Sequence, residues 1–378
     1  MTKKVFISTG ELSGDIHAAN MLKNLLKITD DIEPYAIGGD RLAEAGANLL
    51  FHIKDISVMG FWEVAKKYRQ IKEVWRKTRE FLLNTRPKLV ILVDYPGFNL
   101  KLAKFCSKNG IPAVYYIAPQ IWAWGNRRVK TIRETVREVV CIFPFEVEWY
   151  KSHGVKATYA GHPIFDQIDI STSKQMKRGH LNEFSIGLLP GSRNQEVRYH
   201  LPIMINALRL LLTWNFDVRA SIAVAPNIKP EVWEPFLEEP WVNVIKNNSH
   251  EVIKNSDLVV VSSGTATLET TIFAKPMVVC YRLSLLSYIL GRALTRVRYI
   301  AIPNLLSGSK VVPELIQYRF TSENLAREIS RYIENIAYRE AVSRKLKNIA
   351  STLYIKSPGE EAAKIISKYL LNEIRKAK

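Results

Sequence analysis

Short apolar runs alternate with amphipathic stretches along the first half of the chain. Each apolar run is rich in β-forming residues, ends near Gly, Pro or Asp, and precedes residues with helical periodicity. This alternation predicts a parallel sheet covered by helices. The predicted strands are 5–8, 89–93, 113–117, 139–143 and 156–160.

A second series of the same kind follows a polar stretch that we interpret as a linker. Its predicted strands are 185–189, 220–225, 258–262 and 277–281, with helices around 323–334, 339–352 and 357–376. We therefore predict two doubly wound, Rossmann-like α/β domains facing a cleft, because such sheets bind ligands beyond the carboxyl ends of their strands. The predicted divisions are a first domain 1–168, a linker 169–183, a second domain 184–354 and a terminal helix 355–378.

The chain is long enough for two such domains and is strongly basic. Its 378 residues are 47% hydrophobic, which excludes a disordered chain and a small cross-linked module. Lys and Arg number 54 against 36 Asp and Glu, a formal net charge of +18. An anionic partner must account for this surplus, and a phosphate ligand, a nucleic acid or a lipid surface would each do so.

The sequence predicts a cytoplasmic protein, soluble or peripheral, that needs neither a metal nor a cofactor. No apolar run reaches the roughly 18 residues of a membrane span, and the N-terminal run is too short for a signal peptide. Cys106, Cys141 and Cys280 lie far apart without CxxC spacing, which indicates neither a disulfide framework nor a zinc site. The histidines also lack metal-binding spacing.

Two acidic loops follow predicted strands of the first domain. In Gly10-Glu11-Leu12-Ser13-Gly14-Asp15, Asp15 could simply cap the next helix, whereas Glu11 could hold a sugar hydroxyl or a proton. In Asp94-Tyr95-Pro96-Gly97-Phe98-Asn99, the acid follows a wholly apolar strand. A carboxylate with so few solvating neighbours suits a general base, although a helix cap is again the alternative. Asp94 is the leading catalytic candidate.

Two small-residue loops of the second domain have the pattern of phosphate sites. Pro190-Gly191-Ser192-Arg193 combines a glycine turn, a hydroxyl and a guanidinium before a predicted helix. It lacks the GxxxxGK[ST] spacing, so an ATPase is not indicated. The stretch 262–269 repeats the design, and its Glu269 lies one helical turn in, where a ribose could offer two hydroxyls.

Two stretches, within 61–82 and 285–298, are amphipathic and basic. Their apolar residues recur at three- and four-residue steps with Lys and Arg between or beside them. This composition is typical of helices on anionic lipid, and core-facing helices with solvated basic faces are the alternative. Nucleic acid is a third reading, but no recognised binding motif accompanies the charge.

In their order along the chain, the four loops and four further segments resemble the lipid-A-disaccharide synthase family. The resemblance covers essentially the whole length, and eight landmarks in order are more specific than any one of them. The landmarks are 10–15, 94–99, 116–124 with its Ala-Pro-Gln-Ile-Trp-Ala-Trp, 143–146, 161–163, 189–193, 263–269 and 303–306.

The resemblance implies a two-domain glycosyltransferase of the GT-B architecture. Its second domain would bind the UDP-sugar, its first would present the acceptor, and its terminal helix would return to the first domain. The implied reaction is inverting transfer of 2,3-diacylglucosamine from UDP-2,3-diacylglucosamine to the 6-hydroxyl of 2,3-diacylglucosamine 1-phosphate. It would take place peripherally at the anionic, cytoplasmic face of the inner membrane, and a homo-oligomer is left open.

The resemblance also implies roles for individual residues. Asp94 matches the family's acid in Asp-x-Pro-x-Phe-Asn and looks like the base, with Glu11 and Asp15 as candidate assistants. Some members carry a second acid where this chain has Gly97. UDP-sugar contacts are expected from Gly191, Ser192, Arg193, Ser263, Gly264, Thr265, Glu269 and Asn304, acceptor contacts from Asn99, Gln120 and Trp122, and membrane or acyl contacts from Phe61, Trp62, Leu285, Ile289, Arg292 and Arg296.

Two other functions remain alternatives at this point. A peptidoglycan glycosyltransferase or a UDP-N-acetylglucosamine 2-epimerase would share the architecture and the ribose-binding Glu, but not the Trp122–Trp124 segment. A non-enzymatic basic protein would explain the charge, yet it would give Asp94 and the two phosphate-type loops no task.

Overall fold

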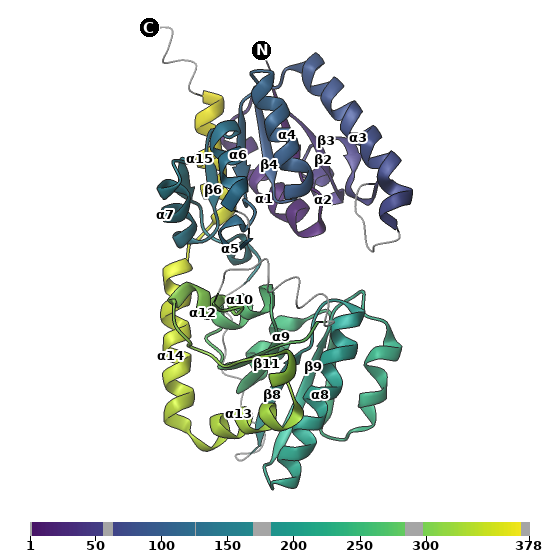
Figure 1. Cartoon of the computed structure of the whole chain (residues 1–378), viewed down its shortest axis with the longest axis vertical. Helices are drawn as coiled ribbons and strands as arrows, with labels where there is room; N and C mark the ends of the chain where they lie inside the picture. The colour runs from purple at the N-terminus through teal and green to yellow at the C-terminus, as the bar shows by residue number, and fades with distance from the viewer. Residues whose placement is uncertain (1, 56–62, 125, 169–182, 284–297, 372–378) are drawn as a thin grey trace. The chain divides into compact units, whose positions relative to one another are not determined.

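Two parallel β-sheets organise the chain (Figure 1), so the predicted fold of two α/β domains is confirmed. The computed structural model describes residues 2–55, 63–124, 126–168, 183–283 and 298–371. The chain forms two compact units. Unit 1 comprises Met1–Ile168 and Leu353–Lys378, and unit 2 comprises Asp169–Thr352.

The sheet of unit 1 has seven strands in the order β3-β2-β1-β4-β5-β6-β7, and all its pairs are parallel. The strands are β1 (Lys3–Ser8), β2 (Ile32–Gly38), β3 (Asn48–His52), β4 (Leu89–Val93), β5 (Ala113–Tyr116), β6 (Val139–Cys141) and β7 (Ala157–Tyr159). Every residue of β4 is buried, as expected for a central strand with helices on both faces. The chain order reverses between the neighbours β1 and β4, which makes the crevice beyond their carboxyl ends the expected ligand site.

Helices flank this sheet, and the last of them comes from the far end of the chain. They are α1 (Leu12–Ile28), α2 (Asp40–Glu44), α3 (Glu63–Thr85), α4 (Pro96–Lys108), α5 (Ile121–Trp124), α6 (Asn126–Thr135), α7 (Pro144–Ser152) and α15 (Pro358–Leu371), with short 3₁₀ turns at Ile53–Asp55 and Pro163–Asp166. Figure 1 shows α15 in yellow beside α1, against which it packs. The Tyr369 hydroxyl donates to Glu138 Oε2, and the Gly359 amide donates to Asp166 Oδ2 at 2.9 Å.

The sheet of unit 2 has six parallel strands in the order β10-β9-β8-β11-β12-β13. They are β8 (Phe184–Leu189), β9 (Val218–Val224), β10 (Val242–Lys246), β11 (Leu258–Ser262), β12 (Met277–Tyr281) and β13 (Glu314–Ile316). Here the order reverses between β8 and β11. The two predicted phosphate loops follow these two strands, so strand order alone brings them together.

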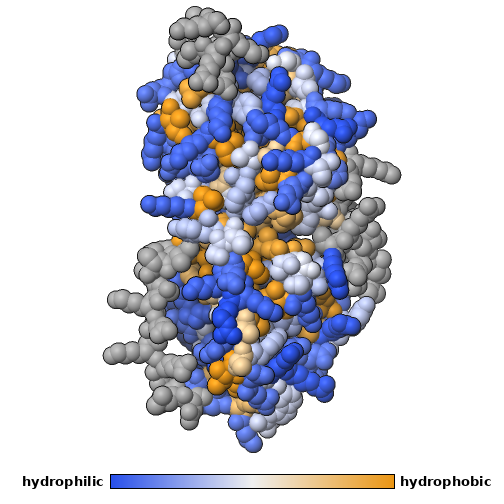
Figure 2. All heavy atoms as spheres, turned by 90° about the vertical axis from the view of Figure 1, so that its left-hand side faces the viewer, coloured by the Kyte–Doolittle hydropathy of each residue, from blue (hydrophilic) through white to orange (hydrophobic). Residues whose placement is uncertain are grey.

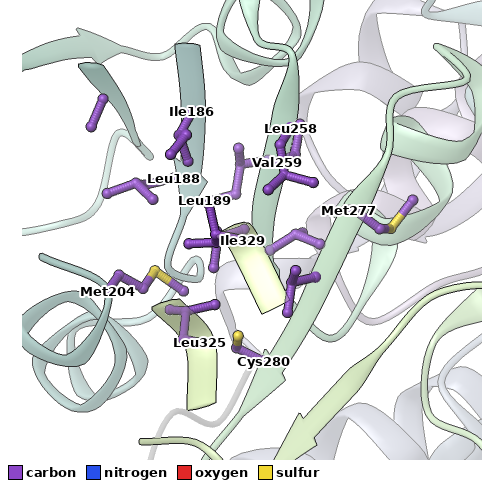
Figure 3. Close-up of a cluster of buried hydrophobic side chains, with 14 of the residues drawn as sticks. Ile186, Leu188, Leu189, Met204, Leu258, Val259, Met277, Cys280, Leu325 and Ile329 are labelled. Carbon is purple, nitrogen blue, oxygen red and sulfur yellow. The ribbon is translucent and has the colours of Figure 1, made fainter. Parts of the chain in front are cut away.

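The helices of unit 2 close a single apolar core against this sheet. They are α8 (Asn194–Thr213), α9 (Ser249–Asn255), α10 (Thr265–Ile272), α12 (Ile302–Ser307), α13 (Ser322–Glu334) and α14 (Ile336–Leu353), with 3₁₀ turns at Pro230–Val232, Glu234–Glu238 and Gln317–Arg319. Figure 3 shows Leu325 and Ile329 of α13 pointing toward the side chains of β8 and β11. This packing fixes the carboxyl ends of the strands from which the loops of unit 2 emerge.

Four observed strands are absent from the sequence prediction. They are β2, β3, β10 and β13. Three of them are edge strands, where one side of the backbone lacks a partner and burial is incomplete, so their apolar pattern is weak. In β2, Glu33 and Pro34 interrupt the apolar run.

Among the described residues, no helix is both long and apolar enough to cross a membrane. On the face in Figure 2, hydrophilic side chains cover much of both units and hydrophobic ones appear in smaller areas.

Candidate functional site

The backbone at the end of β4 is strained where Asp94 emerges. Asp94 and Tyr95 have φ of 46° and 49°, and Ile117, at the end of neighbouring β5, has φ of 54°. Left-handed backbone costs roughly 1–3 kcal/mol for such residues and persists only where the surroundings enforce it. Strain of this kind concentrates at functional sites. The α4 helix is capped by Tyr95 without a side-chain bond, so the cap alternative for Asp94 is not observed.

Hydrogen bonds hold this strained backbone in place. The Asp94 carbonyl accepts from the Tyr115 hydroxyl at 2.7 Å and from Asn99 Nδ2 at 2.8 Å, and its amide donates to the Ile117 carbonyl at 3.1 Å. Asn99, in α4, also accepts from the Ser8 hydroxyl at 2.7 Å, which ties α4 to β1. Asn99 is fully buried, and its side-chain amide also donates to the Ser8 and Val93 carbonyls.

The surroundings of the Asp94 carboxyl group change its pKa. Burial raises its pKa above the usual range, and the negative charge of Glu11 raises it further. Glu11 is exposed at the start of α1, on the loop that follows β1. The reversal of strand order between β1 and β4 therefore explains why these two acids influence each other.

Asp15 has a structural task that does not fit the catalytic role expected of it. Its side chain is fully buried. Its Oδ1 accepts from the amides of Gly39 at 2.6 Å and Leu42 at 3.3 Å, and its Oδ2 accepts from that of Arg41 at 3.0 Å. Asp15 thus caps α2, a different helix from the one that contains it.

A cavity of about 260 Å³ in unit 1 includes Asp94. The other residues that line it are Pro96, Ile117, Ala118, Pro119, Gln120, Ile121, Arg128, Ile142 and Glu146. Gln120, for which an acceptor contact was expected, is exposed here. Trp122 is not among the lining residues, and its indole Nε1 donates to Glu146 Oε1 at 3.1 Å.

Glu146 is a buried acid that the sequence analysis did not single out. Its Oε2 accepts from the backbone amides of Ile142 and Phe143, at 3.2 and 3.1 Å, so the Glu146 side chain reaches back to cap the start of α7. Burial raises its pKa to about 7. The signal was present in Phe143-Pro-Phe-Glu146, where a Glu stands at the third helical position after a Pro.

A larger cavity of about 570 Å³ lies at the carboxyl edge of the unit 2 sheet, within the size range of small-molecule sites. Seven of its lining residues were expected to contact a UDP-sugar: Gly191, Ser192, Arg193, Ser263, Gly264, Thr265 and Glu269. Further lining residues include Glu196, Asn248, Ser249, Ser262 and Tyr281. Two loops 70 residues apart in sequence thus face one space.

The loops leave polar groups available to a ligand. Arg193 forms the N-cap of α8 and its side chain is 79% exposed, with Nη1 3.6 Å from Glu196 Oε1. The Ser262 hydroxyl is buried and has no hydrogen-bond partner among the described residues. A buried donor without a partner is costly unless a ligand satisfies it. Gly264, with φ of 142°, lets the backbone turn tightly into α10.

Glu269 lies in α10, its side chain 17% exposed at the cavity. Its Oε2 accepts from the Ser249 hydroxyl at 3.4 Å and lies 3.6 Å from His250 Nε2. These neighbours orient the carboxylate toward the cavity without occupying both oxygens.

Asn304, the eighth residue expected to contact a UDP-sugar, does not line this cavity. It is fully buried, accepts from the amides of Val311 and Val312, and donates to the Val312 carbonyl and to Glu314 Oε1. Asn304 therefore fixes the loop between α12 and β13.

The remaining sequence predictions concern lipid contact and metals. The expected membrane residues Phe61, Trp62, Leu285, Ile289, Arg292 and Arg296 lie outside the described residues. Within the described ranges, no group of three or more His, Cys, Asp or Glu side chains could hold a metal ion. The three cysteines are free and buried.

Comparison with known proteins decides the family. The sequence pattern of the lipid-A-disaccharide synthetase family matches residues 5–366. The chain belongs to this family. The lipid-A-disaccharide synthase of Syntrophus aciditrophicus is 37% identical over 370 residues, covering 96% of both chains. That of Myxococcus xanthus is 38% identical over 334 residues, covering 87% of both.

Solved structures share the GT-B architecture of the family. A Staphylococcus aureus MnaA–UDP co-structure matches 98% of this chain and 97% of its own with a TM-score of 0.66. A UDP-N-acetylglucosamine 2-epimerase from Neisseria meningitidis, bound to UDP-N-acetylglucosamine, matches 99% of this chain and 100% of its own with a TM-score of 0.60. Both are only 13% identical to this chain, so they show the fold alone. Membership of the synthetase family does not favour the epimerase alternative.

Proposed function

We propose that this chain joins UDP-2,3-diacylglucosamine to 2,3-diacylglucosamine 1-phosphate through a β-1,6 bond and releases UDP. Its family membership supports lipid A disaccharide formation. The observation that carries the proposal is Asp94: a carboxyl group of raised pKa, on strained and tightly held backbone, at the point where strand order reverses.

The reaction is a single displacement at the anomeric carbon. Asp94 takes the proton from the 6-hydroxyl of the acceptor as that oxygen attacks C1 of the donor sugar. The bond between C1 and the UDP oxygen breaks at the same time, so the configuration inverts. A general base of this kind contributes roughly 10²- to 10⁴-fold to the rate.

The unit 2 cavity supplies the donor's binding groups. The exposed guanidinium of Arg193 and the hydroxyl of Ser192 serve the diphosphate, together with the free amides at the start of α10. The unpaired Ser262 hydroxyl can donate to the same anion. Glu269 accepts hydrogen bonds from the ribose hydroxyls, because an ionised carboxylate is an acceptor only.

We also propose a peripheral location on the cytoplasmic face of the inner membrane. Both proposed substrates carry acyl chains, and the formal net charge of +18 favours an anionic lipid surface. In the first of the two basic amphipathic stretches, α3 buries Val74 and Leu82 in the unit 1 core and leaves its described basic side chains exposed, so it would supply charge to the contact. The stretch 285–298 would supply the apolar face.

The test measures UDP release by the purified chain with each substrate alone and with both. Release that requires both, together with a disaccharide 1-phosphate product, supports the proposal. Asp94→Asn keeps the shape but removes the base, so kcat should fall by about 10²- to 10⁴-fold. Stabilisation of the same variant by UDP in a thermal melt should persist. Turnover near the wild-type rate in Asp94→Asn would instead assign the base to Glu11.

A further inference from the structure

A cation lines the unit 1 cavity, and the proposed function gives it a role. Among the described residues that line the cavity, Arg128 is the only basic one, and it shares the cavity with Asp94. Asp94 directly follows β4, whereas Arg128 lies in the first turn of α6, which comes after the adjacent strand β5. The fold therefore brings a proton acceptor and a guanidinium to one space from two neighbouring strand-to-helix connections.

Arg128 is available to a ligand. It is exposed and forms no ion pair with any residue that the structure describes. The nearby Lys130 of the same helix lies 3.9 Å from Glu134, and it does not line the cavity. The first turn of α6 also carries the positive end of the helix dipole, which favours an anion beside Arg128.

The cavity's second acid does not neutralise Arg128. Both oxygens of Glu146 are engaged, one by the Trp122 indole and the other by the amides of Ile142 and Phe143. Because burial raises its pKa to about 7, Glu146 is also partly protonated near neutral pH. A phosphomonoester carries nearly two negative charges at pH 7, so its partner must be a cation. A guanidinium can meet two phosphate oxygens at once.

We propose that Arg128 binds the phosphomonoester of the acceptor, with the Gln120 amide as a neighbouring polar contact. This inference rests on the proposed function and identifies which substituent of the acceptor each group holds. C1, which carries the phosphate, and C5, which carries the 6-hydroxymethyl group, both flank the ring oxygen of the hexose, so the two substituents lie along one edge of the sugar. A phosphate bound by Arg128 therefore keeps the 6-hydroxyl in the cavity that Arg128 shares with Asp94, which favours transfer to that hydroxyl.

The experiment compares Arg128→Gln with Lys130→Gln, a loss of the same charge two residues away on the same helix. Each is assayed with 2,3-diacylglucosamine 1-phosphate and with the same acceptor lacking the phosphate. Arg128→Gln should raise KM for the phosphorylated acceptor by about 10- to 100-fold, the size expected for a lost charge-assisted bond. KM for the UDP-sugar and kinetics with the unphosphorylated acceptor should stay unchanged. Lys130→Gln should match the wild type, and Arg128→Lys should fall between.

If Arg128→Gln impaired the reaction equally with the phosphorylated and the unphosphorylated acceptor, the proposal would be overturned. A merely structural role of Arg128 would affect both acceptors alike. A second measurement separates this failure from failure of the proposed function. Glucosamine 1-phosphate should raise the melting temperature of the wild type and of Lys130→Gln but not of Arg128→Gln, whether or not disaccharide forms. No difference among the three proteins would overturn the phosphate site. Absence of disaccharide from the wild type would overturn only the proposed reaction.

Discussion

The chemistry of this chain depends on how single carboxyl groups are surrounded. Asp94 and Asp15 both follow strands at the reversal of strand order in unit 1, yet their environments differ. Asp15 accepts three backbone amides. Asp94 faces a cavity, and burial and the charge of Glu11 raise its pKa. The first acid therefore stabilises a turn, whereas the second is suited to accept a proton.

The influence of Glu11 gives a prediction about pH. Protonated Asp94 cannot act as a base, so kcat/KM should fall as pH decreases through its raised pKa. Glu11→Gln removes the negative charge that helps to raise this pKa, so the acid limb should move to lower pH while the plateau stays. Glu44→Gln is the control, since Glu44 is an exposed acid of unit 1 that pairs with Arg41. A collapsed plateau in Glu11→Gln would contradict this prediction and identify Glu11 as the base.

At the scale of elements, one buried carboxylate joins two helices. Glu146 lies in the first turn of α7 and accepts from Trp122 of α5 and from the two amides before α7. It thus links the connections that follow β5 and β6, and these connections line the cavity that contains Asp94. Packing of α4 against α6 holds the other side of this region.

Replacing Glu146 should weaken unit 1. Both carboxylate oxygens of Glu146 accept from N–H groups. In Glu146→Gln one of these oxygens becomes an NH₂ group, which cannot accept and leaves an N–H donor without a partner. We therefore expect a loss of about 1–3 kcal/mol in the free energy of unfolding. Because the folded-state pKa of about 7 lies above that of an ordinary Glu, the proton bound by folded Glu146 stabilises the fold most below about pH 4.5. That contribution is lost as pH rises to 7. The difference in the free energy of unfolding between the wild type and Glu146→Gln should therefore become smaller from pH 5 to pH 7.5.

Urea unfolding of the two proteins across this pH range measures the difference. Glu148→Gln is the matched control, since Glu148 is exposed on the same helix. A gap that is constant with pH, or that widens as pH rises, would show that Glu146 is already ionised in the folded chain.

At the scale of the whole molecule, charge and connectivity set the behaviour. The formal net charge is +18, and the sequence pI is about 9.7. The C-terminal helix α15 belongs to unit 1, which also contains the N-terminal part of the chain, and it packs on α1 there. Tyr369 of α15 contributes to this docking by bonding both Glu138 and Lys156.

The charge predicts salt-sensitive binding to lipid. The full chain should sediment with vesicles that contain anionic lipid at about 0.05 M salt and should dissociate largely by about 0.5 M, where the Debye length is far shorter. Vesicles of neutral lipid are the control and should bind less. Sedimentation that does not change with salt would mean that the basic surface does not drive association.

Local pattern was enough to find the central strands and the loops that follow them. It placed Asp94 and Arg193 just after strands and Glu269 in the helix after another, because apolar runs mark buried strands and small or polar residues mark the turns after them. Resemblance along the chain gave the family, which the comparisons show. Neither source depends on how distant segments meet.

Tertiary structure alone decided which of these residues share a space. Strand order is set by long-range pairing, and it brings the loops after β8 and β11 to one cavity. Long-range contacts also bury Asp15 and Asn99 among hydrogen-bond partners from segments that no local pattern connects. Asn304 bonds the nearer residues 311–314, and the way that loop folds back decides its burial. Arg128 likewise stands out only in the folded structure. Its helix α6 comes after β5, which pairs with the strand β4 that precedes Asp94, so both residues line one cavity.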